Sequence, residues 1–332
     1  MINMNKQQLG QYFTKKDLWL KPQIKEFIKK SHCSIAYDPF AGDGDLLSCK
    51  KEYGIKKTEG LDIDINLNWI YNDSLKNIPH LDNAIIVTNP PYLTNYSAKR
   101  KKIMCGLEDY FKLYTDLYQL ALVKMLEAQD YVVAIIPETF INSRFINNVY
   151  SRINNITILV DNPFLDTENP VCVVCFNNKR NKCIKMYVED KYIDTLENIK
   201  SKALIPLKKY KINFNKVDGK LAIRAVDMAS VDKKIEFMPI EELSYDLKNI
   251  KNSSRLITIV EVLDIKIDIK KLAKECNRIL EIYRLETMDL NLSPFKGNAK
   301  DGTRRRRLDY KTARAIIEMS IDNLSEENLD VK

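Results

Sequence analysis

Short apolar runs alternate with longer stretches of mixed polarity along the first half of the chain. Runs at residues 34–37, 58–63, 84–87, 131–136, 156–160 and 171–176 have the length and composition of buried strands. Between them, residues 45–53 and 109–129 carry apolar side chains at helical spacing. Strands that alternate with helices are typical of a parallel sheet with helices on both faces, so the sequence predicts a Rossmann-like α/β fold.

The pattern changes after about residue 190. Lysine becomes more frequent, and Asp218-Gly219 joins two alternating segments in a way that predicts a β-hairpin. Two amphipathic helices are expected at residues 269–285 and 310–320. We therefore expect two domains, residues 1–190 and residues 191–332, of which the second is a smaller, mixed α+β domain.

Composition narrows the class of protein. The 332 residues are 45% hydrophobic and 30% charged, which is typical of a globular chain. No apolar run is long enough to cross a membrane, and residues 1–13 lack the apolar core of a signal peptide. The net charge of +8 is a modest indication of an anionic partner. Seven cysteines without a framework spacing favour a cytoplasmic location.

The cysteine pattern gives little support for a metal site. Cys172 and Cys175 form a CxxC pair, but they lie inside an apolar run and are expected to be buried core thiols. The chain has no second CxxC and only two histidines, His32 and His80. We therefore expect no bound metal.

The segment Asn89-Pro90-Pro91-Tyr92 carries the clearest chemistry. It follows an apolar strand, and its two prolines fix an extended, rigid turn. The Asn89 side chain and the Pro90 carbonyl can then offer two acceptors to one amino group, while Tyr92 offers a flat face for a planar ring. Such a site suits an exocyclic amino group on an aromatic base.

A second motif predicts a nucleotide-type cofactor. The first strand ends at Asp38 and leads into a glycine-bearing turn, Asp38-Pro39-Phe40-Ala41-Gly42-Asp43-Gly44, where a ligand can approach the backbone. Asp62 ends the next strand, where an acidic residue commonly binds two ribose hydroxyls. The full GxGxxG fingerprint and the P-loop lysine are absent, which argues against NAD, FAD and ATP.

The ordered set of GQYFT at residues 10–14, DPFAGDG at 38–44, LDID at 61–64, Asp73 and NPPY at 89–92 resembles the γ class of S-adenosylmethionine-dependent DNA adenine-N6 methyltransferases. The resemblance covers residues 8–178 and implies a Rossmann-like methyltransferase sheet. It implies a cofactor site of Tyr12, Phe13, Thr14, Asp38, Phe40, Gly42, Gly44, Asp62, Ile63 and Asp73. Within this set Asp62 would bind the ribose, and Asp73 would accept from the adenine amino group.

The resemblance also implies a catalytic set. Asn89 and Pro90, held by Pro91, would bind the target N6 amino group of an adenine flipped out of double-stranded DNA. Tyr92 and Phe164 would stack on that base. The setting it suggests is the modification enzyme of a type II restriction–modification system, whose cognate endonuclease would act on the same site without a stable complex. An orphan or phage enzyme would look the same.

Target recognition is expected in the second domain. The run Arg304, Arg305, Arg306 and Arg307 suits phosphate contacts and guanine readout, and Lys99, Arg100, Lys101 and Lys102 could hold phosphates beside a flipped base. Either group could instead be a solvated basic surface.

Three alternatives fit parts of the same pattern. The methyl acceptor could be a protein glutamine or an RNA adenine, since a carboxamide needs the same two acceptors. It could be cytosine N4, which usually goes with serine in place of Asn89. The chain could also be a non-catalytic DNA-binding protein that keeps a degenerate fold.

Overall fold

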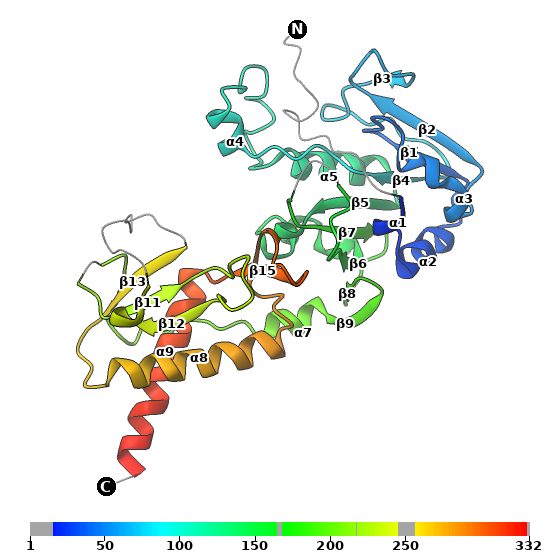
Figure 1. Cartoon of the computed structure of the whole chain (residues 1–332). Coiled ribbons are helices and arrows are strands. Elements are labelled where there is room, and N and C mark those ends of the chain that lie inside the picture. Colours follow the sequence, from blue (N-terminus) through cyan, green and yellow to red (C-terminus); the bar gives the residue numbers. More distant parts are fainter. Residues whose placement is uncertain (1–15, 165–167, 217, 245–255, 331–332) are drawn as a thin grey trace. The chain divides into compact units, whose positions relative to one another are not determined.

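The computed structural model of the chain describes residues 16–164, 168–216, 218–244 and 256–330 (Figure 1). The chain forms two compact units, residues 1–196 and residues 197–332, and each is treated by itself below. None of the helices in the described ranges is long and apolar enough to cross a membrane.

Unit 1 is built on a nine-stranded sheet with the order β3-β2-β1-β4-β5-β7-β6-β8-β9 (Figure 1). Strands β7 and β9 run antiparallel to the others. The strands are β1 (Ile35–Asp38), β2 (Lys57–Asp62), β3 (Ile70–Tyr71), β4 (Ala84–Thr88), β5 (Val132–Pro137), β6 (Ile153–Ile158), β7 (Val171–Phe176), β8 (Lys185–Val188) and β9 (Lys191–Thr195). This open, mostly parallel sheet confirms the predicted α/β fold class.

Helices connect these strands. They are α1 (Lys16–Trp19), α2 (Pro22–Lys30), α3 (Lys50–Tyr53), α4 (Asn95–Arg100), α5 (Leu117–Ala128), α6 (Ile146–Val149) and α7 (Leu196–Ser201), with 3₁₀ turns η2 (Leu47–Cys49), η3 (Glu138–Asn142) and η4 (Tyr150–Arg152). The chain leaves β1 toward β2 on one side and leaves β4 toward β5 on the other. Because crossover connections are right-handed, α3 and α5 cover opposite faces of the sheet.

The structure corrects two expectations in unit 1. Helix α5 begins at Leu117, whereas the sequence pattern predicted a start near residue 109. Residues 93–116 instead fold around a small core of their own, in which Leu93, Leu107 and Phe111 are buried. The sheet also contains two strands that the sequence pattern did not predict. These are β8 and β9, which follow β7 in the sequence, lie at the edge of the sheet and bury little apolar surface. Cys172 and Cys175 are buried in β7, as predicted.

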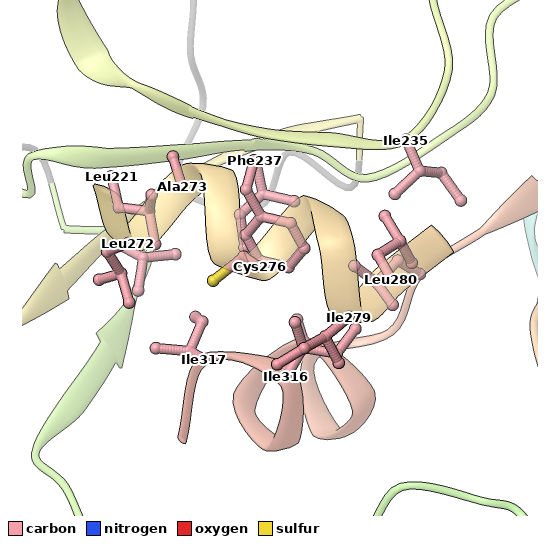
Figure 2. Packing of buried hydrophobic residues seen from close by; sticks show 14 of the residues in the cluster. Leu221, Ile235, Phe237, Leu272, Ala273, Cys276, Ile279, Leu280, Ile316 and Ile317 are labelled. Atoms are coloured by element: carbon pink, nitrogen blue, oxygen red, sulfur yellow. The ribbon is translucent and has the colours of Figure 1, made fainter. Parts of the chain in front are cut away.

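Unit 2 combines a four-stranded antiparallel sheet with two long helices. The sheet has the order β10-β13-β11-β12, with β10 (Ile212–Phe214), β11 (Leu221–Arg224), β12 (Glu236–Pro239) and β13 (Ile257–Val262). A short 3₁₀ turn, η5 (Ile240–Glu242), follows β12. Helices α8 (Ile269–Glu286) and α9 (Tyr310–Asp330) flank a two-stranded ribbon of β14 (Ser293–Asn298) and β15 (Arg304–Arg307). Figure 2 shows side chains of α8, among them Leu272 and Cys276, between the strands and Ile316 and Ile317 of α9.

The hairpin predicted around Asp218-Gly219 is wrong. Strands β10 and β11 both pair with β13, and β13 lies between them. Gly219 lies so close to this strand that a Cβ atom there would meet the Val260 carbonyl oxygen at 2.5 Å. The glycine therefore permits close backbone approach to β13, not a two-residue hairpin turn.

Candidate functional site

The sequence-predicted residues of unit 1 gather at the carboxyl edge of the sheet. The strand order reverses between β1 and β4, because β1 continues to β2 on one side while β4 continues to β5 on the other. In open α/β sheets ligands bind outside the carboxyl ends of the strands at such a switch point. The glycine turn follows β1 and the Asn89-Pro90-Pro91-Tyr92 segment follows β4, so both flank this point.

Asp38, the last residue of β1, ties these two loops together. Its Oδ1 accepts hydrogen bonds from the Phe40 backbone amide at 2.9 Å and from the Thr88 hydroxyl at 2.5 Å. Burial raises the pKa of Asp38 to about 7, although both hydrogen bonds oppose the shift. Asp38 therefore acts first as a structural link between the ends of β1 and β4.

The glycine turn is held against the end of β2. Gly42 and Gly44 both have positive φ, +53° and +81°, which explains the residue type. The Gly42 amide donates to Asp62 Oδ2 at 2.8 Å, and the Asp64 amide donates to Asp62 Oδ1, also at 2.8 Å. Each carboxylate oxygen has two lone pairs, so each retains one acceptor site among the described residues. Asp62 thus presents two acceptors side by side.

Phe40 belongs to this turn, and Ile63 follows Asp62 at the end of β2. The Phe40 side chain, two residues past β1, is half-buried, and the Ile63 side chain, directly after Asp62, is 48% exposed. Both leave apolar surface beside the turn, which suits walls of a ligand site.

Trp69 is a residue of this site that the sequence analysis missed. Its indole Nε1 donates to the Gly42 carbonyl oxygen at 2.8 Å. A Cβ atom at Gly44 would lie 2.9 Å from the Trp69 ring, and one at Gly60 would lie 2.5 Å from it. The two glycines therefore make room for the indole, which forms a wall of the turn. A tryptophan in the loop that follows Asp62 is the sequence signal that could have indicated it.

Asp73 follows β3 and stands beside the end of β2, because the Asn72 amide donates to the Asp62 carbonyl at 2.9 Å. Its Oδ2 accepts from the Tyr110 hydroxyl at 2.8 Å and pairs with the Lys76 ammonium at 3.0 Å. Tyr110 belongs to the segment between β4 and α5, and nothing in the linear sequence indicated its contact with Asp73.

The Asn89-Pro90-Pro91-Tyr92 segment leaves β4 as a rigid turn. Pro90, Pro91 and Tyr92 are buried, and Asn89 is half-buried. The Tyr92 hydroxyl contacts the Asn89 amide oxygen and lies 2.6 Å from the Ile135 carbonyl oxygen of β5. The tyrosine thus anchors the amide at the end of the strand.

Phe164 lies against Tyr92, although 72 positions separate them in the sequence. The ring centroids are 6.2 Å apart with planes at 62°, an edge-to-face contact. The Phe164 amide donates to Asn162 Oδ1 at 3.0 Å, which shapes the preceding turn. A base between two parallel rings needs about 7 Å, since aromatic carbons touch at about 3.5 Å. Entry of a base between these rings therefore requires one of them to turn.

Asp116 binds the residue that follows the Asn89–Tyr92 segment. Its Oδ1 accepts from the Leu93 amide at 3.0 Å, and the Leu117 amide donates to the Leu93 carbonyl at 3.1 Å. Burial raises the pKa of Asp116 to about 7. The start of α5 is therefore joined directly to the residue after Tyr92.

The two predicted basic groups differ in their surroundings. Lys99, Arg100, Lys101 and Lys102, at the end of α4, all have exposed side chains. In unit 2, Arg306 of β15 is buried, and its amide donates to Asp227 Oδ2 at 3.0 Å. Arg305 stacks on the Phe295 ring and donates to two backbone carbonyls, while Arg304 donates to Asn298 Oδ1. Arg307 is half-buried in β15.

Tyr12, Phe13 and Thr14 lie outside the described residues. Within the described residues, no three histidine, cysteine, aspartate or glutamate side chains are grouped as metal ligands.

Comparison with known proteins finds only distant structural similarity. No protein-family model and no curated protein sequence matches it. Among solved structures, it is similar to a type I restriction-modification methyltransferase subunit from Streptococcus thermophilus, with 16% identity over 53% of this chain and 50% of that one, TM-score 0.37. The chain thus spans only half the length of that subunit.

Two further structures are similar over about half of the chain. A candidate RNA methyltransferase from Pyrococcus horikoshii has 17% identity over 53% of this chain and 91% of that one, TM-score 0.32. The type IIL restriction-modification enzyme MmeI in complex with DNA has 12% identity over 51% and 36%, TM-score 0.32. These values are too low to carry a function from one protein to another, so the function must be argued from the chain's own residues.

Proposed function

We propose that the chain is an S-adenosylmethionine-dependent methyltransferase that modifies the N6 amino group of adenine in a specific double-stranded DNA sequence. The observation that carries this proposal is the meeting of the Asp38–Gly44 turn and the Asn89–Tyr92 turn at the switch point of the sheet. One turn suits a nucleotide-like cofactor, the other suits a planar amine, and they are joined through Asp38 and Thr88.

The residues present fit this cofactor. Gly42 leaves open space beside the backbone, since a Cβ atom there would have no neighbour within 4 Å. Asp62 offers one acceptor on each carboxylate oxygen, which matches a pair of ribose hydroxyls. Asp73 would bind the adenine amino group, with Ile63 and Phe40 as apolar walls. When bound, S-adenosylmethionine supplies an activated methyl electrophile.

The chain's own residues would position the target amine. The Asn89 amide oxygen and the Pro90 carbonyl accept its two hydrogens, which frees the nitrogen lone pair for attack and needs no nucleophilic side chain. Positioning and local dipoles then supply most of the rate. Pro91 keeps the turn rigid, and the Tyr92 and Phe164 rings hold the base face. The proton leaves through Asn89 or Pro90 to water.

DNA is the substrate that the charges favour. The exposed cations at Lys99–Lys102 follow the Asn89–Tyr92 turn directly and would contact phosphates beside a flipped base. Unit 2 would read the sequence, with Arg304, Arg305 and Arg307 as the arginines of β15 that are not fully buried. The biological role would be modification within a restriction–modification system, in which an endonuclease acts separately on the same site.

One experiment tests the reaction. Unmethylated duplex DNA is incubated with the protein and methyl-labelled S-adenosylmethionine, and the digested nucleosides are identified by mass spectrometry. N6-methyladenine supports the proposal. N4-methylcytosine would overturn the choice of base, and label in RNA or protein substrates alone would overturn the choice of DNA.

A further inference from the structure

Asp73 has an unequal set of hydrogen-bond donors around its two carboxylate oxygens. Oδ2 accepts from the Tyr110 hydroxyl at 2.8 Å and from the Lys76 ammonium at 3.0 Å. Oδ1 accepts from the Leu75 amide at 3.2 Å. A carboxylate oxygen has two lone pairs, so among the described residues the remaining acceptor site is on Oδ1. An incoming amino group would therefore bind Oδ1, while Oδ2 holds the carboxylate in orientation.

The two donors to Oδ2 are not equivalent. The Lys76 side chain is 72% exposed, so its ion pair is screened by water and its geometry is loosely held. Tyr110 is a partly buried side chain that, like Leu75, packs against the small core of residues 93–117, which contains Leu107 and Phe111. Burial, together with the Asp73 carboxylate, raises the pKa of the Tyr110 hydroxyl, so it remains a donor. The fixed donor to Asp73 is thus Tyr110.

We propose that Tyr110 is a positioning residue that orients the Asp73 carboxylate toward the adenine amino group of the cofactor, and so sets selectivity for adenine over a 6-oxo purine. The inference rests on the proposed function, because it takes Asp73 as the adenine-binding acid. A 6-oxo purine presents an oxygen acceptor where adenine presents an amino donor. A correctly oriented carboxylate repels that oxygen, whereas a carboxylate free to rotate discriminates less.

The segment that carries Tyr110 also explains why the orientation of the Asp73 carboxylate would be precise. Asp116 accepts a hydrogen bond from the Leu93 amide, and Thr94 forms a β-bridge with Asp116, so the two ends of residues 93–117 are joined to each other. Leu75, two residues after Asp73, packs into the core of this same segment. The Asp73 carboxylate and the Tyr110 hydroxyl are therefore held together by their hydrogen bond and by the packing of Leu75 and Tyr110 against one apolar core.

The test compares two cofactor products, S-adenosylhomocysteine and its 6-oxo analogue S-inosylhomocysteine, by calorimetric titration of the full chain. For Tyr110→Phe, which keeps the ring, we expect affinity for the adenosyl compound to fall about tenfold, and affinity for the inosyl compound to stay unchanged. The ratio of the two affinities therefore falls about tenfold. Tyr114→Phe is the matched control. Tyr114 lies in the same segment as Tyr110, but its ring packs on Phe145, so this variant should leave both affinities unchanged.

The outcomes separate this inference from the proposed function. Asp73→Ala should abolish the discrimination. If Asp73→Ala abolishes it and Tyr110→Phe keeps the wild-type ratio, the role of Tyr110 is refuted while the adenine site stands. If Asp73→Ala leaves the ratio unchanged, the adenine site is refuted and the role of Tyr110 with it. Equal losses for both compounds in Tyr110→Phe would show a structural role only, which also overturns the inference.

Discussion

The Thr88 hydroxyl donates a hydrogen bond of 2.5 Å to the buried carboxylate of Asp38. The two residues end neighbouring parallel strands, and each is followed by one of the two turns of the site. This one bond therefore fixes the spacing between the turn that suits a cofactor and the turn that suits a target amine.

Asp38 makes unit 1 less stable at higher pH. Its pKa is about 7 in the folded chain and 3.8 for an unperturbed carboxyl, so the folded state binds more protons between these values. Stability therefore falls as pH rises from about 4 to about 7, by at most about 4 kcal/mol. Asp38→Asn should reduce this fall, and Asp116, whose pKa is also about 7, should account for a remaining part.

Tryptophan fluorescence measures this effect in unit 1 alone, because both tryptophans, Trp19 and Trp69, belong to it. Urea unfolding is compared at pH 5 and pH 8. An identical pH dependence in wild type and Asp38→Asn would refute the prediction.

Gly44→Ala should cost more than Gly54→Ala. Both glycines have positive φ, +81° and +76°, so each alanine pays about 1–2 kcal/mol of backbone strain. At Gly44 the new methyl would also lie 2.9 Å from the Trp69 ring, whereas at Gly54 it meets nothing within 4 Å. Thermal unfolding followed by circular dichroism checks stability. Only Gly44→Ala should also weaken binding of S-adenosylhomocysteine, and equal effects at both sites would contradict this account.

Asn89→Ala should lower methyl transfer by orders of magnitude and leave cofactor affinity nearly unchanged. The variant removes one of the two acceptors for the target amine. The Asp38–Gly44 turn is held by hydrogen bonds to the Asp38 and Asp62 carboxylates. Single-turnover transfer and calorimetric titration of S-adenosylhomocysteine measure the two properties separately. A comparable loss in cofactor affinity would mean that Asn89 is a structural residue.

Replacing Lys99, Arg100, Lys101 and Lys102 together by alanine should weaken DNA binding mostly at low salt. Each phosphate contact contributes about 0.9 to the slope of log affinity against log salt, so the slope should become shallower by up to about 3.6. Fluorescence anisotropy at several salt concentrations measures it. An unchanged slope would identify these residues as a solvated surface without DNA contacts.

Asp227→Ala should destabilise unit 2 by about 3–5 kcal/mol, because it leaves the partly buried Arg284 without one of its two carboxylate partners. Burial by itself would raise the pKa of Asp227, but hydrogen bonds from Arg284 and two backbone amides hold that pKa below its usual value. Its stabilisation is therefore present above about pH 4 and is lost as pH falls further, opposite in sign to Asp38.

The matched control for Asp227 is Asp264→Asn, because Asp264 has a φ of +60° and asparagine tolerates this left-handed conformation as aspartate does. Asp264 pairs with Lys211 on the surface, with both side chains more than 70% exposed, so its loss should cost no more than about 1 kcal/mol. Far-UV circular dichroism in urea follows the unfolding of the whole chain, and tryptophan fluorescence follows unit 1. Similar losses in the two variants would argue against a stabilising role for the Asp227–Arg284 pair.

The sequence by itself determined the six central strands of unit 1 and the turns that follow β1 and β4. Apolar runs of four to six residues favour buried strands because they are too short for a typical helix and are bounded by turn residues. Asp38, Asp62 and Asn89 could be assigned to one edge of the sheet because all carboxyl ends of parallel strands meet there. The glycines at 42 and 44 marked the turn after β1 as one where a ligand can approach the backbone, and the structure adds that both have positive φ.

Only the tertiary structure decided which of these ends are neighbours. The order β2-β1-β4 brings Asp38 to Thr88, and nothing local to either strand specifies that pairing. The contacts of Trp69 with Gly44 and Gly60, of Tyr110 with Asp73, and of Phe164 with Tyr92 join residues 9 to 72 positions apart. The late start of α5 and the insertion of β13 between β10 and β11 have the same origin, because packing between distant segments overrode local periodicity.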